Sequence, residues 1–209
     1  PPVPLNDAPA RAGVPFPTAP AHGKRRAERT CVRGNANMIH IDDEKIADIA
    51  AREALLDRAM GAGRRLKASE RIREGRLPSR GLAFVARDNG RVVGSVRLWD
   101  VEAGGRRSLL LGPLAVEPGA QSRGLGSGLM QVALNRAALA GHASVILVGD
   151  PEYYERFGFA ADPARGLIMP GPFERRRMLG LELADGALSG AEGVVIGTGA
   201  MLPAWQLAA

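Results

Sequence analysis

The hydrophobic and polar positions of the first half of the chain alternate with the period of β-strands. Asn89 and Gly90 separate two such segments, and this pair is typical of a hairpin turn because both residues tolerate a positive φ. Gly104 and Gly105 predict a second turn. The pattern therefore predicts a short first strand and then three consecutive antiparallel strands, over residues 38–41, 81–87, 91–101 and 107–116.

The period then changes to that of a helix. Apolar residues at a four-residue step predict a helix over residues 123–140, and Gly141 is suited to end it. Its predicted buried face consists of Leu125, Leu129, Ala133 and Ala137. The fully apolar run 145–148 is typical of a buried central strand.

Four further segments are predicted less sharply. Asp42 or Asp43 is expected to cap a helix that buries Ile46, Ile49, Ala50 and Leu55. The other three are a helix over residues 62–76, a brief helix from Pro151 to about Phe157, and a strand pair within residues 166–183.

The charge is unevenly distributed. Of the net charge of +6 over 209 residues, +4 lies in residues 1–37, which also hold seven of the fifteen prolines. We expect this segment to be a disordered or loosely ordered basic extension, followed by a single domain over residues 38–209. The body of the chain is nearly balanced, and its basic residues are not interleaved with aromatic ones, which argues against a nucleic-acid partner.

The cysteines, histidines and apolar runs of the chain argue against disulfide-bonded, metal-binding and membrane-spanning proteins. Cys31 is the only cysteine, and His22, His40 and His142 lack metal-ligand spacing, so no disulfide and no metal site are expected. No apolar run approaches the roughly 20 residues that span a bilayer. These features favour a cytoplasmic protein without a membrane partner.

A glycine-rich turn carries the sharpest chemical signal. Gly124 and Gly126 lie between a predicted strand and a predicted helix, where unpaired amides and the helix dipole favour a phosphate or pyrophosphate. The alternative is a tight turn whose glycines only let the helix pack on the sheet. A Walker A loop is excluded because no lysine follows Gly126.

Three motifs in order resemble the GNAT superfamily of N-acetyltransferases, and in particular its small bacterial members described as predicted N-acetyltransferases. The motifs are Leu114-Ala115-Val116, Gln121-Ser122-Arg123-Gly124-Leu125-Gly126 and Tyr154-Glu155-Arg156-Phe157-Gly158-Phe159. The resemblance covers about residues 38–197. It implies an α/β (α+β) fold, in which a mixed, mostly antiparallel sheet is flanked by helices and splayed at an acetyl-CoA site.

The resemblance also implies roles for single residues. Backbone groups around Leu114, Ala115 and Val116 would hold the pantetheine arm and the thioester carbonyl. Tyr154 would protonate the departing thiolate as general acid and belongs to the acetyl-CoA site. The pyrophosphate would lie on the amides of Gln121, Ser122, Arg123, Gly124, Leu125, Gly126 and Ser127. Tyr153, the residue before Tyr154, is interpreted either as a packing residue or as a proton donor.

The general base is not identified by the resemblance. The strand segment 108–113 carries no acid, and Asp100, Glu102 and Glu117 are the nearest carboxylates. Glu102 is a candidate base; a water chain or a purely solvated role for these acids are the alternatives.

The implied function is transfer of an acetyl group from acetyl-CoA to a primary amine on a small molecule or a protein, by a monomer or a homodimer. The alternative is a catalytically weak acyl-CoA-binding module with a regulatory or interaction role, which the missing acid supports. The arginine-rich residues 64–76 form either a solvated helical face or the lining of an acceptor pocket that prefers an anionic acceptor.

Overall fold

A computed structural model describes residues 30–33, 38–121 and 124–203. They form one nine-stranded sheet in which seven strands follow the order β1-β2-β3-β4-β5-β6-β8, while β9 pairs with β4 and with β7. The strands are β1 (Thr30–Arg33), β2 (Met38–Asp43), β3 (Ala83–Asp88), β4 (Arg91–Ala103), β5 (Arg106–Val116), β6 (Ser144–Val148), β7 (Leu167–Ile168), β8 (Met178–Glu182) and β9 (Gly193–Gly197). The helices are α1 (Ile49–Met60), α2 (Ala68–Arg73), α3 (Leu125–Leu139) and α4 (Pro151–Tyr154).

The antiparallel half of the sheet confirms the alternating pattern. Strands β2, β3, β4 and β5 pair antiparallel in sequence order. The β3–β4 turn places Asn89 and Gly90 at positive φ, as the Asn-Gly pair predicts. The mixed, mostly antiparallel sheet with flanking helices is thus the predicted fold class.

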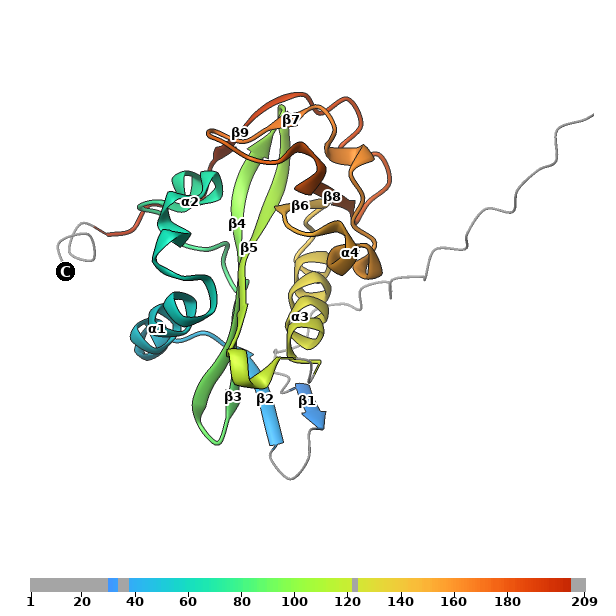
Figure 1. The fold of residues 1–209 in the computed structure, drawn as a ribbon. Helices are drawn as coiled ribbons and strands as arrows, with labels where there is room; N and C mark the ends of the chain where they lie inside the picture. Colours follow the sequence, from blue (N-terminus) through green and yellow to red (C-terminus); the bar gives the residue numbers. More distant parts are fainter. Residues whose placement is uncertain (1–29, 34–37, 122–123, 204–209) are drawn as a thin grey trace, which may run out of the picture.

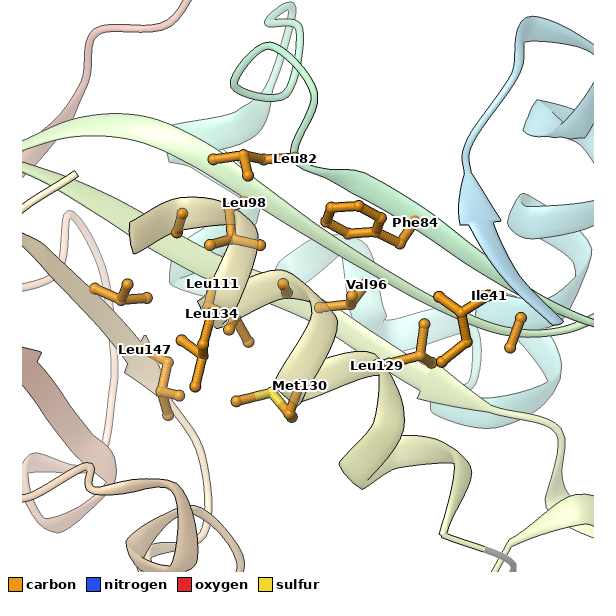
Figure 2. Close-up of a cluster of buried hydrophobic side chains, with 14 of the residues drawn as sticks. Ile41, Leu82, Phe84, Val96, Leu98, Leu111, Leu129, Met130, Leu134 and Leu147 are labelled. Atoms are coloured by element: carbon orange, nitrogen blue, oxygen red, sulfur yellow. The ribbon is translucent and has the colours of Figure 1, made fainter. Parts of the chain in front are cut away.

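Helices cover both faces of the sheet (Figure 1): α1 and α2 lie on one side, and α3 lies on the other. The predicted face of α3 is buried throughout, at Leu125, Leu129, Ala133 and Ala137. Figure 2 shows Leu129, Met130 and Leu134 of this helix against Val96 and Leu98 of β4. At the C-terminal end of α3, Gly141 has a φ of +84° and the His142 amide donates to the Ala137 carbonyl, which closes the helix as a Schellman motif.

The predicted start of the first helix is wrong. Asp42 and Asp43 still belong to β2, where they pair with β3, so the chain is extended at the point where a cap was expected. The helix begins later, after Asp48, and it buries Leu55 as predicted. Ile46 is 76% exposed and Ile49 is 38% exposed, so the predicted apolar face is only partly buried.

Two other predictions need correction. Residues 62–76 form a 3-10 turn over Ala62–Leu66 and then the short helix α2, because the extended backbone of Lys67 separates them. The strands within residues 166–183 do not pair with each other. Instead β7 runs parallel to β9, and β8 pairs antiparallel with β6.

Four residues of the predicted N-terminal extension, Thr30–Arg33, form β1, which pairs antiparallel with β2. The rest of that extension lies outside the described residues. Within the described part of the chain, every helix is too short or too polar to cross a membrane.

The sheet opens between the parallel strands β5 and β6. β5 and β6 pair only at Leu109 with Val145 and at Leu110 with Ile146. Beyond these pairs β6 continues along β8, while residues 111–116 of β5 have no strand partner on that edge among the described strands. The gap exposes backbone donors and acceptors of β5, which require partners of another kind.

Candidate acetyl-CoA site at the open edge of the sheet

A cavity of about 570 Å³ lies where β5 ends and α3 begins. It is lined by Leu114, Val116, Ala120, Gln121, Gly124, Leu125, Gly126, Ser127, Tyr153 and Arg156. The structure therefore brings most of the predicted cofactor residues to one cavity. Ala115 differs: its side chain is buried on the opposite face of β5, in a cluster with Leu55 and Leu56. Ser122 and Arg123 lie outside the described residues.

The N-terminus of α3 offers several amides to this cavity. Gly124 is the N-cap residue with a φ of +76°, a left-handed conformation that glycine adopts without a steric penalty. The first hydrogen bond of the helix runs from the Gly128 amide to the Gly124 carbonyl, so the amides of Leu125, Gly126 and Ser127 have no acceptor within the helix. The helix dipole adds to them, and the end of α3 is suited to an anion.

Tyr153 and Arg156 complete the cavity wall. A Cβ atom at Gly126 would lie 2.6 Å from the Tyr153 hydroxyl oxygen, so only glycine leaves room for this contact. The Tyr153 hydroxyl is hydrogen-bonded to the Ser127 side chain. The Arg156 guanidinium lies 4.9 Å from the centre of the Tyr153 ring and brings a positive charge to the cavity.

From the sequence, Tyr153 is either a packing residue or a proton donor, and Arg156 has no assigned role. Their spacing was an available signal. Two residues three positions apart in one helical segment lie on the same face, so a cavity that is lined by Tyr153 is also expected to be lined by Arg156.

Tyr154 lies at the other edge of the gap. A Cβ atom at Gly149, the residue after β6, would lie 2.2 Å from the Tyr154 ring, which shows how closely the ring covers that backbone. The ring also makes edge contacts with Tyr153 and Phe159, at centroid distances of 4.9 and 6.0 Å. Burial, with a smaller contribution from Tyr153, raises the pKa of Tyr154 to about 12. The hydroxyl is therefore protonated at neutral pH, which is the state that a proton donor requires.

The structure does not bring the candidate base Glu102 to this cavity. Glu102 is exposed on β4 opposite Arg107. It is six strand positions from Val96, the residue opposite Leu114, which corresponds to about 20 Å at 3.3 Å per residue. Glu117 follows directly after β5, but Arg58 hydrogen-bonds both of its carboxylate oxygens. These bonds lower the pKa of the Glu117 carboxyl, which makes it a weaker base.

β5 is irregular at the point where the gap begins. Val96 is opposite Leu114 and Leu98 is opposite Leu111, so Gly112 and Pro113 together face one residue of β4 as a β-bulge. Gly112 has a φ of +128°, and its carbonyl accepts a hydrogen bond of 2.5 Å from the Trp99 indole N–H. The bulge turns the backbone of residues 112–114 relative to a regular strand. Among the described residues, no group of three or more His, Cys, Asp or Glu side chains could hold a metal ion.

Comparisons with known proteins agree with this geometry. A family model described as an acetyltransferase (GNAT) domain matches residues 79–161. The Escherichia coli (strain K12) protein named uncharacterized N-acetyltransferase YhbS is 32% identical over 145 residues, which cover 68% of this chain and 86% of that protein. The chain belongs to the GNAT family of acetyltransferases.

Solved structures of two family members are similar to most of this chain. The GNAT family N-acetyltransferase YhbS from Escherichia coli, in complex with CoA, has a TM-score of 0.65 and 28% identity, over 85% of this chain and 94% of that one. A GNAT family acetyltransferase from Brucella melitensis, in complex with acetyl-CoA, has a TM-score of 0.52 and 26% identity, over 68% of this chain and 95% of that one.

Proposed function

We propose that this chain binds acetyl-CoA in the cavity at the end of β5 and transfers its acetyl group to a primary amine. The observation that carries the proposal is the cavity itself, in which the open edge of β5 meets the unpaired amides of α3. The CoA and acetyl-CoA complexes of the two similar structures support it.

In this proposal the pyrophosphate lies on the turn 121–127, where it accepts hydrogen bonds from the amides at the start of α3. Arg156 adds a cation and Tyr153 forms the wall. The pantetheine arm follows the open edge of β5 and takes the place of the missing strand partner by hydrogen bonding with backbone groups of Leu114, Ala115 and Val116. Fixed amides in a site that excludes water are strong donors for the thioester carbonyl oxygen as negative charge develops on it.

The amine must be neutral before it attacks, and a lysine-like amine has a pKa of about 10.4. Its nitrogen forms a bond to the thioester carbon, the tetrahedral intermediate collapses, and the carbon–sulfur bond breaks. We propose that Tyr154, protonated and adjacent to the end of β6, gives its proton to the departing sulfur. The proton that the amine loses passes to solvent rather than to Glu102, which lies too far along β4, and the Tyr154 phenolate takes a proton back from solvent.

The test is a transfer assay that follows released CoA thiol with acetyl-CoA and a mixture of primary amines. The account expects amine-dependent thiol release by the wild type. It also expects slower release by Tyr154→Phe, with an unchanged affinity for acetyl-CoA. No release with any amine would overturn the transferase proposal even if acetyl-CoA binds.

A further inference from the structure

Arg73, in the last turn of α2, is a buried cation that faces the start of the gap. The residue is 7% exposed. Its Nη1 atom lies 3.8 Å from the position that a Cβ atom would take at Gly112, in the bulge of β5 just beyond the last pair with β6. A full positive charge is thus held beside the backbone where, in the proposed function, the thioester lies.

The side chain is incompletely paired. Nη2 donates to Glu70 Oε2 at 2.7 Å and to Ser69 Oγ at 3.2 Å, whereas the buried Nε has no hydrogen-bond partner among the described residues. Burial without full pairing is costly for a guanidinium, which carries five N–H donors. Accordingly burial lowers the pKa of Arg73, and the neighbouring charges of Arg64 and Arg97 lower it further, against the opposing effect of Glu70.

Nearby carboxylates are engaged by other arginines. Glu53 is paired with Arg52 and Arg64, at 2.9 and 2.5 Å. Glu44 is paired with Arg52 and accepts hydrogen bonds from Arg97. Arg73 is therefore paired with a single carboxylate, that of Glu70, and some of its N–H donors remain available for another partner.

Arg73 and the cavity lie on opposite faces of the sheet. α2 packs on Leu110 and Ile146, whereas Leu114 and Val116 pack with the core under α3, and Figure 1 shows the two helices on opposite sides. The gap between β5 and β6, where residues 111–116 of β5 have no pair with β6, lies between these two faces. A cofactor that enters from the α3 side and an amine that enters from the α2 side would meet in it, and the amine would pass Arg73.

We propose that the amine acceptor of this site carries an anionic group, such as a carboxylate or a phosphate, and that Arg73 binds this group. The inference rests on the proposed transferase function. Arginine suits the role because its planar fork pairs with two oxygens of such an anion, and a binding partner would use the donors that the fold leaves unpaired.

The experiment offers wild-type protein amines in matched pairs: β-alanine with its amide, glutamate with glutamine, and phosphoethanolamine with ethanolamine. Released CoA thiol gives kcat/KM for each. We expect the more anionic member of at least one pair to be favoured by about tenfold to a hundredfold, the range of a hydrogen-bonded charge. Arg73→Gln should abolish that preference mainly through KM for the amine, with unchanged affinity for acetyl-CoA.

Arg71→Gln is the matched control, because Arg71 lies on the same helix but is exposed and donates to the Pro170 carbonyl. It should keep the preference. Equal use of both members of every pair by the wild type would overturn the inference and leave the transferase proposal intact, and so would a preference that survives Arg73→Gln. Absence of thiol release with every amine would instead defeat both. If Arg73→Gln does not fold, the wild-type comparison still tests whether the acceptor is anionic.

Discussion

Gly126→Ala separates the stability of the fold from the function of the cavity. The new methyl carbon would lie 2.6 Å from the Tyr153 hydroxyl oxygen, which is closer than van der Waals contact allows, so the Tyr153 side chain must move away from residue 126. Because Gly126 is helical, alanine itself is favourable there by about 0.4–1 kcal/mol. We therefore expect the free energy of unfolding to change by less than about 1 kcal/mol in either direction, since this gain opposes the cost of moving Tyr153.

The affinity for acetyl-CoA should fall much more. The displaced Tyr153 ring would occupy the space where the pyrophosphate approaches the amides of α3. Loss of one hydrogen bond to a charged group costs about 1.5–3 kcal/mol, which corresponds to about ten- to hundredfold in Kd. Calorimetric titration with acetyl-CoA and urea unfolding of the same samples measure the two quantities.

The double variant Gly126→Ala/Tyr153→Phe tests the cause. Without the hydroxyl, the nearest atom of the ring is Cζ at 3.7 Å, an ordinary contact. The double variant should therefore bind acetyl-CoA as well as Tyr153→Phe alone. Unchanged affinity in Gly126→Ala, or a double variant that is no better than Gly126→Ala, would refute the steric argument.

Three further expectations concern the proposed proton donor Tyr154, the candidate base Glu102 and the hydrophobic core. Because the pKa of Tyr154 is about 12, the kcat of the wild type should not fall between pH 7 and 10 through loss of this proton, and a fall in kcat over that interval that Tyr154→Phe removes would contradict its assignment. Glu102→Gln should retain wild-type kcat/KM in the thiol-release assay, whereas a loss of tenfold or more would restore Glu102 as a candidate base. Leu129→Ala, at a fully buried position, should lower the free energy of unfolding by about 2–5 kcal/mol in urea denaturation, and Leu139→Ala, at a position 46% exposed, should cost clearly less.

The antiparallel strands and α3 could be predicted because each has its own local signal. The Asn89-Gly90 turn sets the β3–β4 hairpin, and the step from Leu125 to Ala137 matches one buried helical face. Elements whose partners are distant could not be predicted in the same way. β7 finds β9 and β8 finds β6 through contacts that no short window of sequence contains.

The residues of the candidate site differ in the same way: some have a local sequence signal, whereas others depend on how distant elements pack. The glycine turn was recognisable because the left-handed conformation of Gly124 is a local requirement of the backbone. Arg73 was only one of several arginines in residues 64–76, and its position opposite Gly112 depends on how α2 packs on the sheet. Glu102 seemed near the turn in sequence, but an extended strand carries it away at about 3.3 Å per residue.

The measurement that tests the central claim most directly is calorimetric titration of the full chain with acetyl-CoA, beside Gly124→Val and Gly119→Val. Gly124 lines the cavity at a φ of +76°, where a β-branched residue is strained, whereas Gly119 has no positive φ and its Cβ would meet nothing within 4 Å. The account predicts saturable binding that Gly124→Val abolishes and Gly119→Val preserves. Absence of binding by the wild type, or equal binding by all three proteins, would contradict an acetyl-CoA site on this turn.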